Sequence, residues 1–156
     1  MDNLATSPLR LSVRGTSAQG EKPAAVELEL PADVRCIEEA VELMARHCFA
    51  GFMPCSRTGF RLRVLLAEAI SNSILFGAGG DPSRRVRVRA ELHDADILLE
   101  VTDDGPGFNP AEVADPTLPD GLARPIGRGL FLIKNLADHV EFNERGNTIW
   151  MTLPRS

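Results

Sequence analysis

The sequence predicts an α/β (α+β) fold, a two-layer sandwich in which a mixed, mainly antiparallel sheet carries three helices on one face. Short segments alternate apolar and polar residues, as strands with one solvated face do, and three longer segments repeat their apolar residues at helical spacing. Their order is strand, helix, helix, strand, strand, loop, helix, strand, strand. With 156 residues, 44% of them hydrophobic, the chain is long enough for one domain with a sizeable core.

The chain divides into a tail and a single domain. Residues 1–24 are rich in Ser, Ala, Gly and Pro and are expected to form a flexible tail with at most one short strand, at residues 9–13. The domain is expected over residues 25–154, and no internal repeat is found in it.

The elements of the domain follow from periodicity and from the Gly- and Pro-rich stretches between periodic segments. They are, in chain order, a strand at 26–30, a helix capped by Asp33 and ending near Phe49, a helix at 57–76, strands at 85–92 and 97–103 joined by the turn HDAD, a helix at 127–137, and a hairpin at 140–153. The stretch 109–125 contains four prolines and little periodicity, which predicts a long loop of the kind that often forms a lid.

Composition excludes several classes of function. The net charge of -5 gives no general attraction to nucleic acid or to anionic lipid, so neither is expected as a partner. The three cysteines have no CxxC spacing, which argues against a disulfide framework and a zinc site. No segment has the apolar length of a signal peptide or a membrane span, and a cytoplasmic protein is expected.

The first candidate for chemistry is the pair Glu68 and Asn72. Four positions apart on a predicted helix, they lie on one face at the edge of its apolar stripe, where a cleft between helix and sheet would open. A carboxylate there can act as a general base, and an amide oxygen can ligate a hard cation that bridges phosphates. Taken alone, the pair is better explained as a solvent-facing Glu and a helical Asn, because short motifs recur by chance.

The second candidate is the segment VTDDGPGF. A strand delivers Asp103 to its end, and Gly105 and Gly107 then allow a sharp turn and a close approach of backbone to ligand. The Asp103 carboxylate could accept a hydrogen bond from an exocyclic amine such as that of adenine. The same letters also fit a simple turn, with Asp104 exposed.

The third candidate is the segment GRGLFLI. Gly127 and Gly129 are predicted to open a helix whose first NH groups and positive dipole end suit a phosphate, and Arg128 can add charge. A buried helix that merely begins with glycine is the alternative. The conjunction of the three segments in this order within one small domain favours a nucleotide site.

Together these segments resemble those of the GHKL family of ATPases and kinases, which includes gyrase, heat-shock chaperone, histidine kinase and mismatch-repair types. LLAEAISNS resembles the N box, VTDDGPGF the first glycine box and GRGLFLIKNLAD the second, and the resemblance covers about residues 26–153. The short lid and the ending GLFLIKNLADHVEF resemble bacterial anti-sigma-factor serine kinases of the RsbW type. Ser73 and Phe76 depart from the Ala and His common in the N box, and the lid sequence matches no motif of the family.

The resemblance implies the Bergerat ATP-binding fold with ATP and Mg²⁺ under the lid. It assigns Glu68 as catalytic base, Asn72 as magnesium ligand and Asp103 as adenine contact, with Thr148 supporting the adenine. It also assigns the nucleotide loops to Gly105, Gly107, Gly127, Arg128, Gly129 and Leu130.

The resemblance further implies a serine/threonine-protein kinase that is a homodimer and regulates transcription. Its substrate would be a serine on a STAS-type anti-anti-sigma protein, and a sigma factor would be the competing partner. The main alternative is a non-catalytic, ATP-gated protein that sequesters a sigma factor or another regulator. A detached histidine-kinase catalytic domain ranks last, because the chain has no phosphoacceptor helix pair.

Two remaining features have plain interpretations. Arg85, Arg87 and Arg89 alternate along one strand and are expected to form a solvated face, with docking of an acidic partner as the alternative. Phe131 and Trp150 are expected in the core.

Overall fold

The computed structural model describes residues 8–15, 24–50, 54–79, 81–107 and 125–155, and for residues 125–127 the backbone only. The predicted lid, residues 109–125, lies outside the described residues except at its last position. Among the described residues, every helix is too short or too polar to cross a bilayer.

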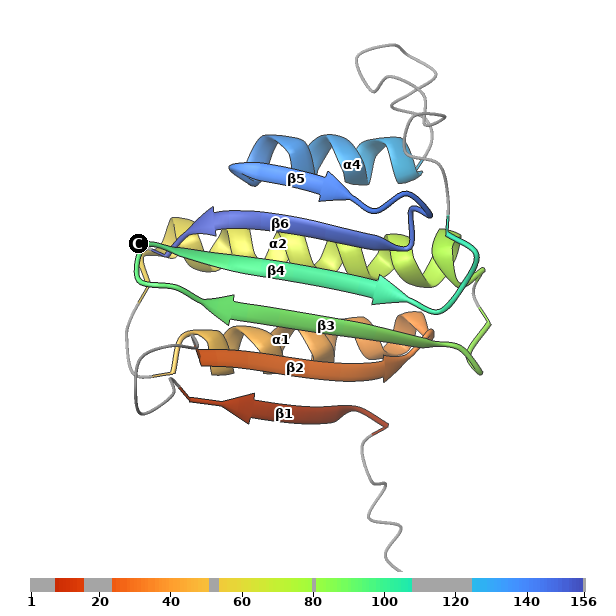
Figure 1. Cartoon of the computed structure of the whole chain (residues 1–156), viewed down its shortest axis with the longest axis horizontal. Coiled ribbons are helices and arrows are strands. Elements are labelled where there is room, and N and C mark those ends of the chain that lie inside the picture. The colour runs from red at the N-terminus through yellow and green to blue at the C-terminus, as the bar shows by residue number, and fades with distance from the viewer. Residues whose placement is uncertain (1–7, 16–23, 51–53, 80, 108–124, 156) are drawn as a thin grey trace, which may run out of the picture.

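The sheet has six strands in the order β1-β2-β3-β4-β6-β5 (Figure 1). They are β1 (Arg10–Arg14), β2 (Ala24–Pro31), β3 (Arg85–Leu92), β4 (Asp96–Asp103), β5 (His139–Phe142) and β6 (Thr148–Pro154). Each neighbouring pair is antiparallel. The predicted fold class is confirmed, and strand β1 occupies the place expected for a short N-terminal strand.

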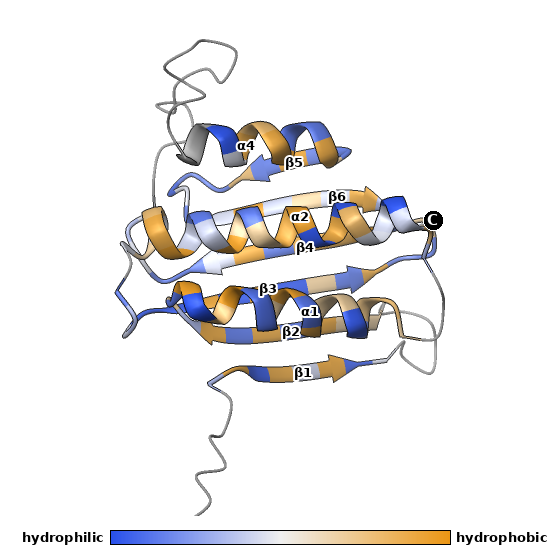
Figure 2. Cartoon of the chain, turned by 180° about the vertical axis from the view of Figure 1, so that it is seen from behind, coloured by the Kyte–Doolittle hydropathy of each residue, from blue (hydrophilic) through white to orange (hydrophobic). Residues whose placement is uncertain are grey.

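Three α-helices of the described part of the chain cover one face of the sheet, which Figure 2 shows from the helix side. They are α1 (Ile37–Cys48), α2 (Ser56–Asn72) and α4 (Pro125–Leu136). A 3₁₀ turn, η1 (Val34–Cys36), precedes α1, and the side chain of Asp33 caps it by accepting a hydrogen bond from the NH of Arg35 at 2.9 Å. The core lies between the two layers and is formed by the apolar stripes of the helices and the inward-facing residues of the strands.

The second helix ends differently from the prediction. Its α-helical part stops at Asn72, and residues Ser73–Gly77 form a π-helical turn, η2, in which the NH of Ala78 donates to the carbonyl of Ser73 at 2.7 Å. Such wider turns are often found at functional sites. The turn brings the chain from the end of α2 to the C-terminal end of strand β4.

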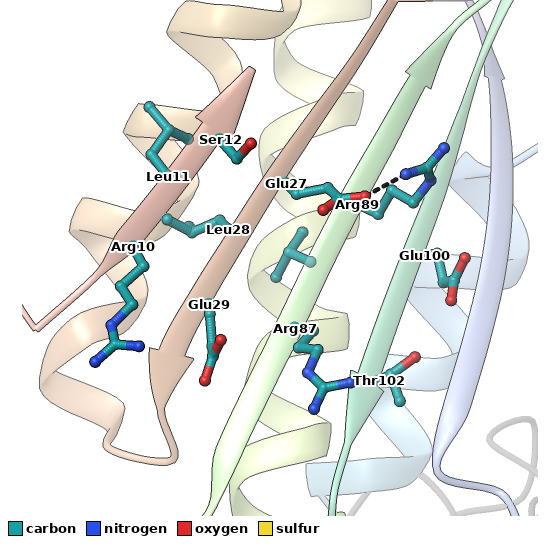
Figure 3. A pocket seen from close by; sticks show the side chains of 11 residues that line it. Arg10, Leu11, Ser12, Glu27, Leu28, Glu29, Arg87, Arg89, Glu100 and Thr102 are labelled. Atoms are coloured by element: carbon teal, nitrogen blue, oxygen red, sulfur yellow. Dashed lines mark hydrogen bonds and ion pairs between the residues drawn. The ribbon is translucent and has the colours of Figure 1, made fainter. Parts of the chain in front are cut away.

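The other face of the sheet is open and charged. Glu27, Glu29, Arg87 and Arg89 line a shallow hollow of about 460 Å³ across β1 to β4, and Arg89 forms an ion pair with Glu27 (Figure 3). The solvated face expected for the arginines of β3 is therefore present.

The expected core positions of two aromatic residues were wrong. Phe131 is 39% exposed on α4, because Leu130 and Ile133 occupy the inward side of that helix. Trp150 is only half-buried and lies on the open face with Glu141 and Thr152.

Candidate functional site

Glu68 and Asn72 lie on the side of α2 that faces α4. Glu68 is half-buried, and Asn72 is only 6% exposed. The amide nitrogen of Asn72 is buried and has no hydrogen-bond partner in the described part of the chain. Since a buried polar group without a partner is costly, this amide is poised for a ligand.

Helix α4 begins at Pro125, two residues before the predicted start at Gly127. Proline suits the first helical position because its missing NH would have no partner there. Gly127 is consequently in the first turn, where NH groups lack helical partners. Gly129 follows two residues later, so both glycines lie in the N-terminal part of the helix, as predicted.

The role of Gly129 in this structure is steric. A Cβ atom at this position would lie 2.7 Å from Oε2 of Glu68, 3.3 Å from Oδ1 of Asn72 and 3.4 Å from its Nδ2. Only glycine lets the backbone of α4 approach the two polar side chains so closely. The next residue, Leu130, is buried and anchors the helix, whereas Arg128 is exposed.

Asp103 lies at the end of β4 and is 4% exposed. Its Oδ1 accepts a hydrogen bond from the NH of Gly105 at 2.8 Å. Burial raises the pKa of the Asp103 carboxyl above the ordinary value of 3.8, and the Gly105 hydrogen bond opposes part of that rise.

Close backbone contacts surround Asp103. A Cβ atom at Gly77, in the π-helical turn, would lie 2.1 Å from Oδ2 of Asp103, and a Cβ at Gly105 would lie 2.0 Å from the carbonyl oxygen of Gly77. Gly107 has φ of +80°, and a Cβ there would lie 2.1 Å from the carbonyl oxygen of Arg145. The first glycine segment is thus packed between the end of α2 and the β5–β6 hairpin.

Thr148 lies on the strand next to Asp103, but its hydroxyl is 3.0 Å from the hydroxyl of Thr102. The contact to the Asp103 residue comes instead from Asn147, whose side chain donates to the Asp103 carbonyl at 3.1 Å and whose own carbonyl accepts from the Asp103 NH at 2.9 Å. The predicted support of adenine by Thr148 stays a prediction.

A small cavity joins the separate parts of the site. It is lined by residues of α2, α4 and the β5–β6 hairpin, including Asn72, Leu130, Asn147 and Thr148. No described residue of the segment VTDDGPGF lines this cavity; that segment meets the same end of the helix layer through the close approach of Gly77 to Asp103 and of Gly107 to Arg145.

The sequence interpretation missed several residues of this region. Gly77 stands in FGAGG, where the run of glycines indicated only the end of the helix and gave no sign of a contact with Asp103. Asn143 accepts hydrogen bonds from the NH groups of Asn147 and Thr148 at 3.0 and 3.1 Å and so shapes the hairpin turn. Asp104, expected to be exposed, is exposed, but its carboxylate also accepts from the NH of Arg85 at 3.2 Å. The two asparagines in the turn NERGN could have indicated the hydrogen bonds of Asn143 and Asn147, because asparagine side chains often bond to the backbone of turns.

The donor set suits a nucleotide with Mg²⁺ better than a metal held by protein alone. The described residues contain no group of three or more His, Cys, Asp or Glu side chains able to hold a metal ion. Mg²⁺ commonly takes one or two protein oxygens together with phosphates and water. The buried, unpartnered amide of Asn72 beside Glu68 fits that pattern, since an amide offers an oxygen to a cation and an NH to a phosphate.

Comparison with known proteins adds a family match and two relatives. Residues 30–153 match the family described as histidine kinase-like ATPase domain. The chain is 30% identical to the anti-sigma F factor of Oceanobacillus iheyensis over 122 residues, which cover 71% of this chain and 82% of that protein. It is 32% identical to the anti-sigma F factor of Bacillus cytotoxicus over 121 residues, with the same coverage.

Proposed function

The chain belongs to the histidine kinase-like ATPase family, and on that premise we propose that it is an ATP- and Mg²⁺-dependent serine protein kinase that acts as an anti-sigma factor. Its relatives are named anti-sigma F factors, which supports a place in partner switching. The proposed substrate is a serine of a STAS-type anti-anti-sigma protein, and the proposed competing partner is a sigma factor. A cytoplasmic location and a homodimer belong to the same proposal.

The observation that carries the proposal is the contact between α2 and α4. Gly129 is far in the sequence from Glu68 and Asn72, yet it lies so close to them that a Cβ added there would be 2.7 Å from Oε2 of Glu68 and in tight contact with the Asn72 amide. A carboxylate and an unpartnered amide are thereby held beside the first turns of a helix. Phosphoryl transfer needs little more from a protein than positioned charge and a group that orients the nucleophile.

Each residue then has a definite task. Glu68 would accept the proton of the attacking serine hydroxyl, and Asn72 would hold Mg²⁺. Asp103 would accept a hydrogen bond from the adenine amino group, and the NH of Gly127 would face a phosphate. When bound, Mg²⁺ would neutralise charge that develops on the phosphate oxygens.

The test is phosphoryl transfer from labelled ATP to a STAS-domain protein, with Glu68→Gln compared to wild type. Loss of a general base typically lowers a rate by about 10²–10⁴-fold, so we expect at least about 100-fold slower serine labelling and little change in the Kd for ATP. Glu38→Gln is the matched control, because Glu38 is an exposed carboxylate on α1. It should label the substrate at the wild-type rate.

Asn72→Ala separates metal binding from base chemistry. We expect it to weaken ATP binding in Mg²⁺ and to leave binding in EDTA nearly unchanged. Tight ATP binding by the wild type without labelling of any STAS protein would overturn the kinase proposal. That outcome would favour the ATP-gated binding protein instead.

A further inference from the structure

Arg61 lies on the same stripe of α2 as the two polar residues of the site. Glu68 and Asn72 follow it about two and three turns further along the helix, and whole turns return side chains to one face. The Arg61 side chain is only 13% exposed, although arginine is rarely buried without a partner. Arg61, Glu68 and Asn72 therefore all lie on the face of α2 that packs against α4.

The partners of Arg61 are at the C-terminal end of α4. Its Nε donates to the carbonyl of Leu136 at 2.7 Å, and its Nη2 donates to Oδ1 of Asp138 at 3.2 Å. Leu136 is the last residue of α4, so its carbonyl has no helical partner and lies at the negative end of the helix dipole. The guanidinium thus caps α4 from a neighbouring helix.

Helix α4 is fixed to α2 at both ends, by the close approach of Gly129 near its N-terminus and by the Arg61 hydrogen bonds at its C-terminus. The N-terminal half touches Glu68 and Asn72 through Gly129, and the C-terminus is bonded to Arg61, so α4 runs antiparallel to α2. Between these points the helix is held by buried apolar side chains, Leu130 and Ile133. Apolar contacts are not directional and tolerate small displacements, whereas two hydrogen bonds from one planar guanidinium do not.

We propose that Arg61 is a positioning residue, which fixes the register of α4 along α2 and so sets the spacing between the Gly129 backbone and the Glu68–Asn72 pair. This inference rests on the proposed function, in which Glu68 and Asn72 act on the nucleotide phosphates and Mg²⁺ beside the N-terminal turns of α4. Arg61 acts from a distance, since its two hydrogen bonds to described residues are at the opposite end of α4.

The test compares Arg61→Met with Arg63→Met in the full chain. Arg63 is on the same helix but is 45% exposed and pairs with Glu42 of α1, so it serves as the matched control. We expect Arg61→Met to raise the Kd for ADP in Mg²⁺ and the KM for ATP at least about 10-fold, with a smaller change in kcat. Arg63→Met should change each of these less than about 2-fold.

Two further measurements separate positioning from simple loss of stability. The amides of Gly129 and Leu130 should exchange hydrogen faster in Arg61→Met than in Arg63→Met, under conditions where urea unfolding shows both variants to be folded. Arg61→Lys keeps one donor for the Leu136 carbonyl and should recover part of the nucleotide affinity. If Arg61→Met does not fold, Arg61→Lys and Asp138→Asn take its place, each with an expected loss of affinity of about 2- to 5-fold.

The outcomes distinguish the inference from the function beneath it. Wild-type protein that fails to bind ADP or ATP would overturn the proposed function. The inference alone would be overturned if the wild type binds nucleotide but the Arg61 variants have the same Kd for ADP as Arg63→Met. Their amide hydrogen exchange at Gly129 would then also equal that of Arg63→Met.

Discussion

At the scale of single residues, Asp103 combines burial with a carboxylate oxygen, Oδ2, that accepts no hydrogen bond from the described residues. One oxygen of its carboxylate accepts from the NH of Gly105, and the other lies against Gly77 without a side chain between them. Burial of this charge destabilises the folded protein at neutral pH, which is why the pKa of Asp103 is raised. A ligand that donates a hydrogen bond to the carboxylate would offset part of this cost and lower the pKa again.

This arrangement predicts a pH dependence of nucleotide binding. Because the ionised carboxylate is the better acceptor, affinity should fall as pH decreases through the raised pKa of Asp103, that is, beginning above the ordinary range near 3.8. Asp103→Asn should lower the affinity for ADP about 10-fold and remove this pH dependence, while the unliganded protein is at least as stable as wild type at pH 7. Titration calorimetry from neutral pH downward, over the range in which the protein stays folded, would measure it.

Asp104→Asn is the control for this experiment. Asp104 is the neighbouring exposed residue, and its substitution keeps an oxygen for the NH of Arg85. A wild-type affinity that does not change with pH, or an identical profile for both variants, would contradict the role given to Asp103.

At the scale of elements, α2 carries most of the site. Its buried face packs into the core, its polar stripe meets α4, and its π-helical end delivers Gly77 to Asp103. The two glycines of this segment are in opposite situations. A Cβ at Gly59 would meet only the end of the flexible Arg63 side chain, at 3.2 Å, whereas a Cβ at Gly77 would meet Asp103 at 2.1 Å.

Alanine substitutions at these two positions should therefore have opposite signs. Gly59→Ala removes glycine from a helix and should raise the free energy of unfolding by about 0.5–1 kcal/mol. Gly77→Ala forces Asp103 or the turn to move and should lower it by about 1–3 kcal/mol, with weaker ADP binding. Urea unfolding followed by circular dichroism measures both, and equal effects of the two substitutions would show that the Gly77 contact is unimportant.

At the scale of the whole molecule, the open face of the sheet has charges arranged by strand. Across β1 to β4 it presents Arg10, then Glu27 and Glu29, then Arg87 and Arg89, then Glu100 (Figure 3). A second copy, turned by a two-fold axis parallel to the strands between β2 and β3, would place β2 over β3 and β1 over β4. The acidic residues of β2 would then face Arg87 and Arg89 of β3, and Arg10 would face Glu100, a self-complementary arrangement of the kind that an isologous interface can use.

We therefore expect the proposed homodimer to use this face. Arg87→Glu should place like charges opposite each other and weaken dimerisation at least about 10-fold, and Arg87→Glu with Glu29→Arg should restore part of it. Arg46→Glu, on the exposed side of α1, makes the same change in net charge and should leave the dimer intact. Sedimentation equilibrium at low salt is the measurement. A monomeric wild type would refute the homodimer, and a dimer unaffected by Arg87→Glu would place the interface elsewhere.

The sequence alone was sufficient for the layers and the family, and it marked the segments that form the candidate site. Alternation and helical spacing reflect which side of each element is buried, so the strands at 85–92 and 97–103 and the helices could be predicted without knowing their partners. The boxes around Glu68, Asp103 and Gly129 could be identified because each depends on residue types at short, fixed spacing.

Only the tertiary structure decided how these segments meet. The contact of Gly129 with Glu68, that of Gly77 with Asp103, and the bond from Arg61 to Leu136 join positions that are distant in the chain, and no local pattern encodes them. Phe131 was misplaced for the same reason, since an aromatic residue on a short helix is buried only if a neighbour covers it. Local propensity determines each element, but its burial and its contacts depend on the packing of the whole chain.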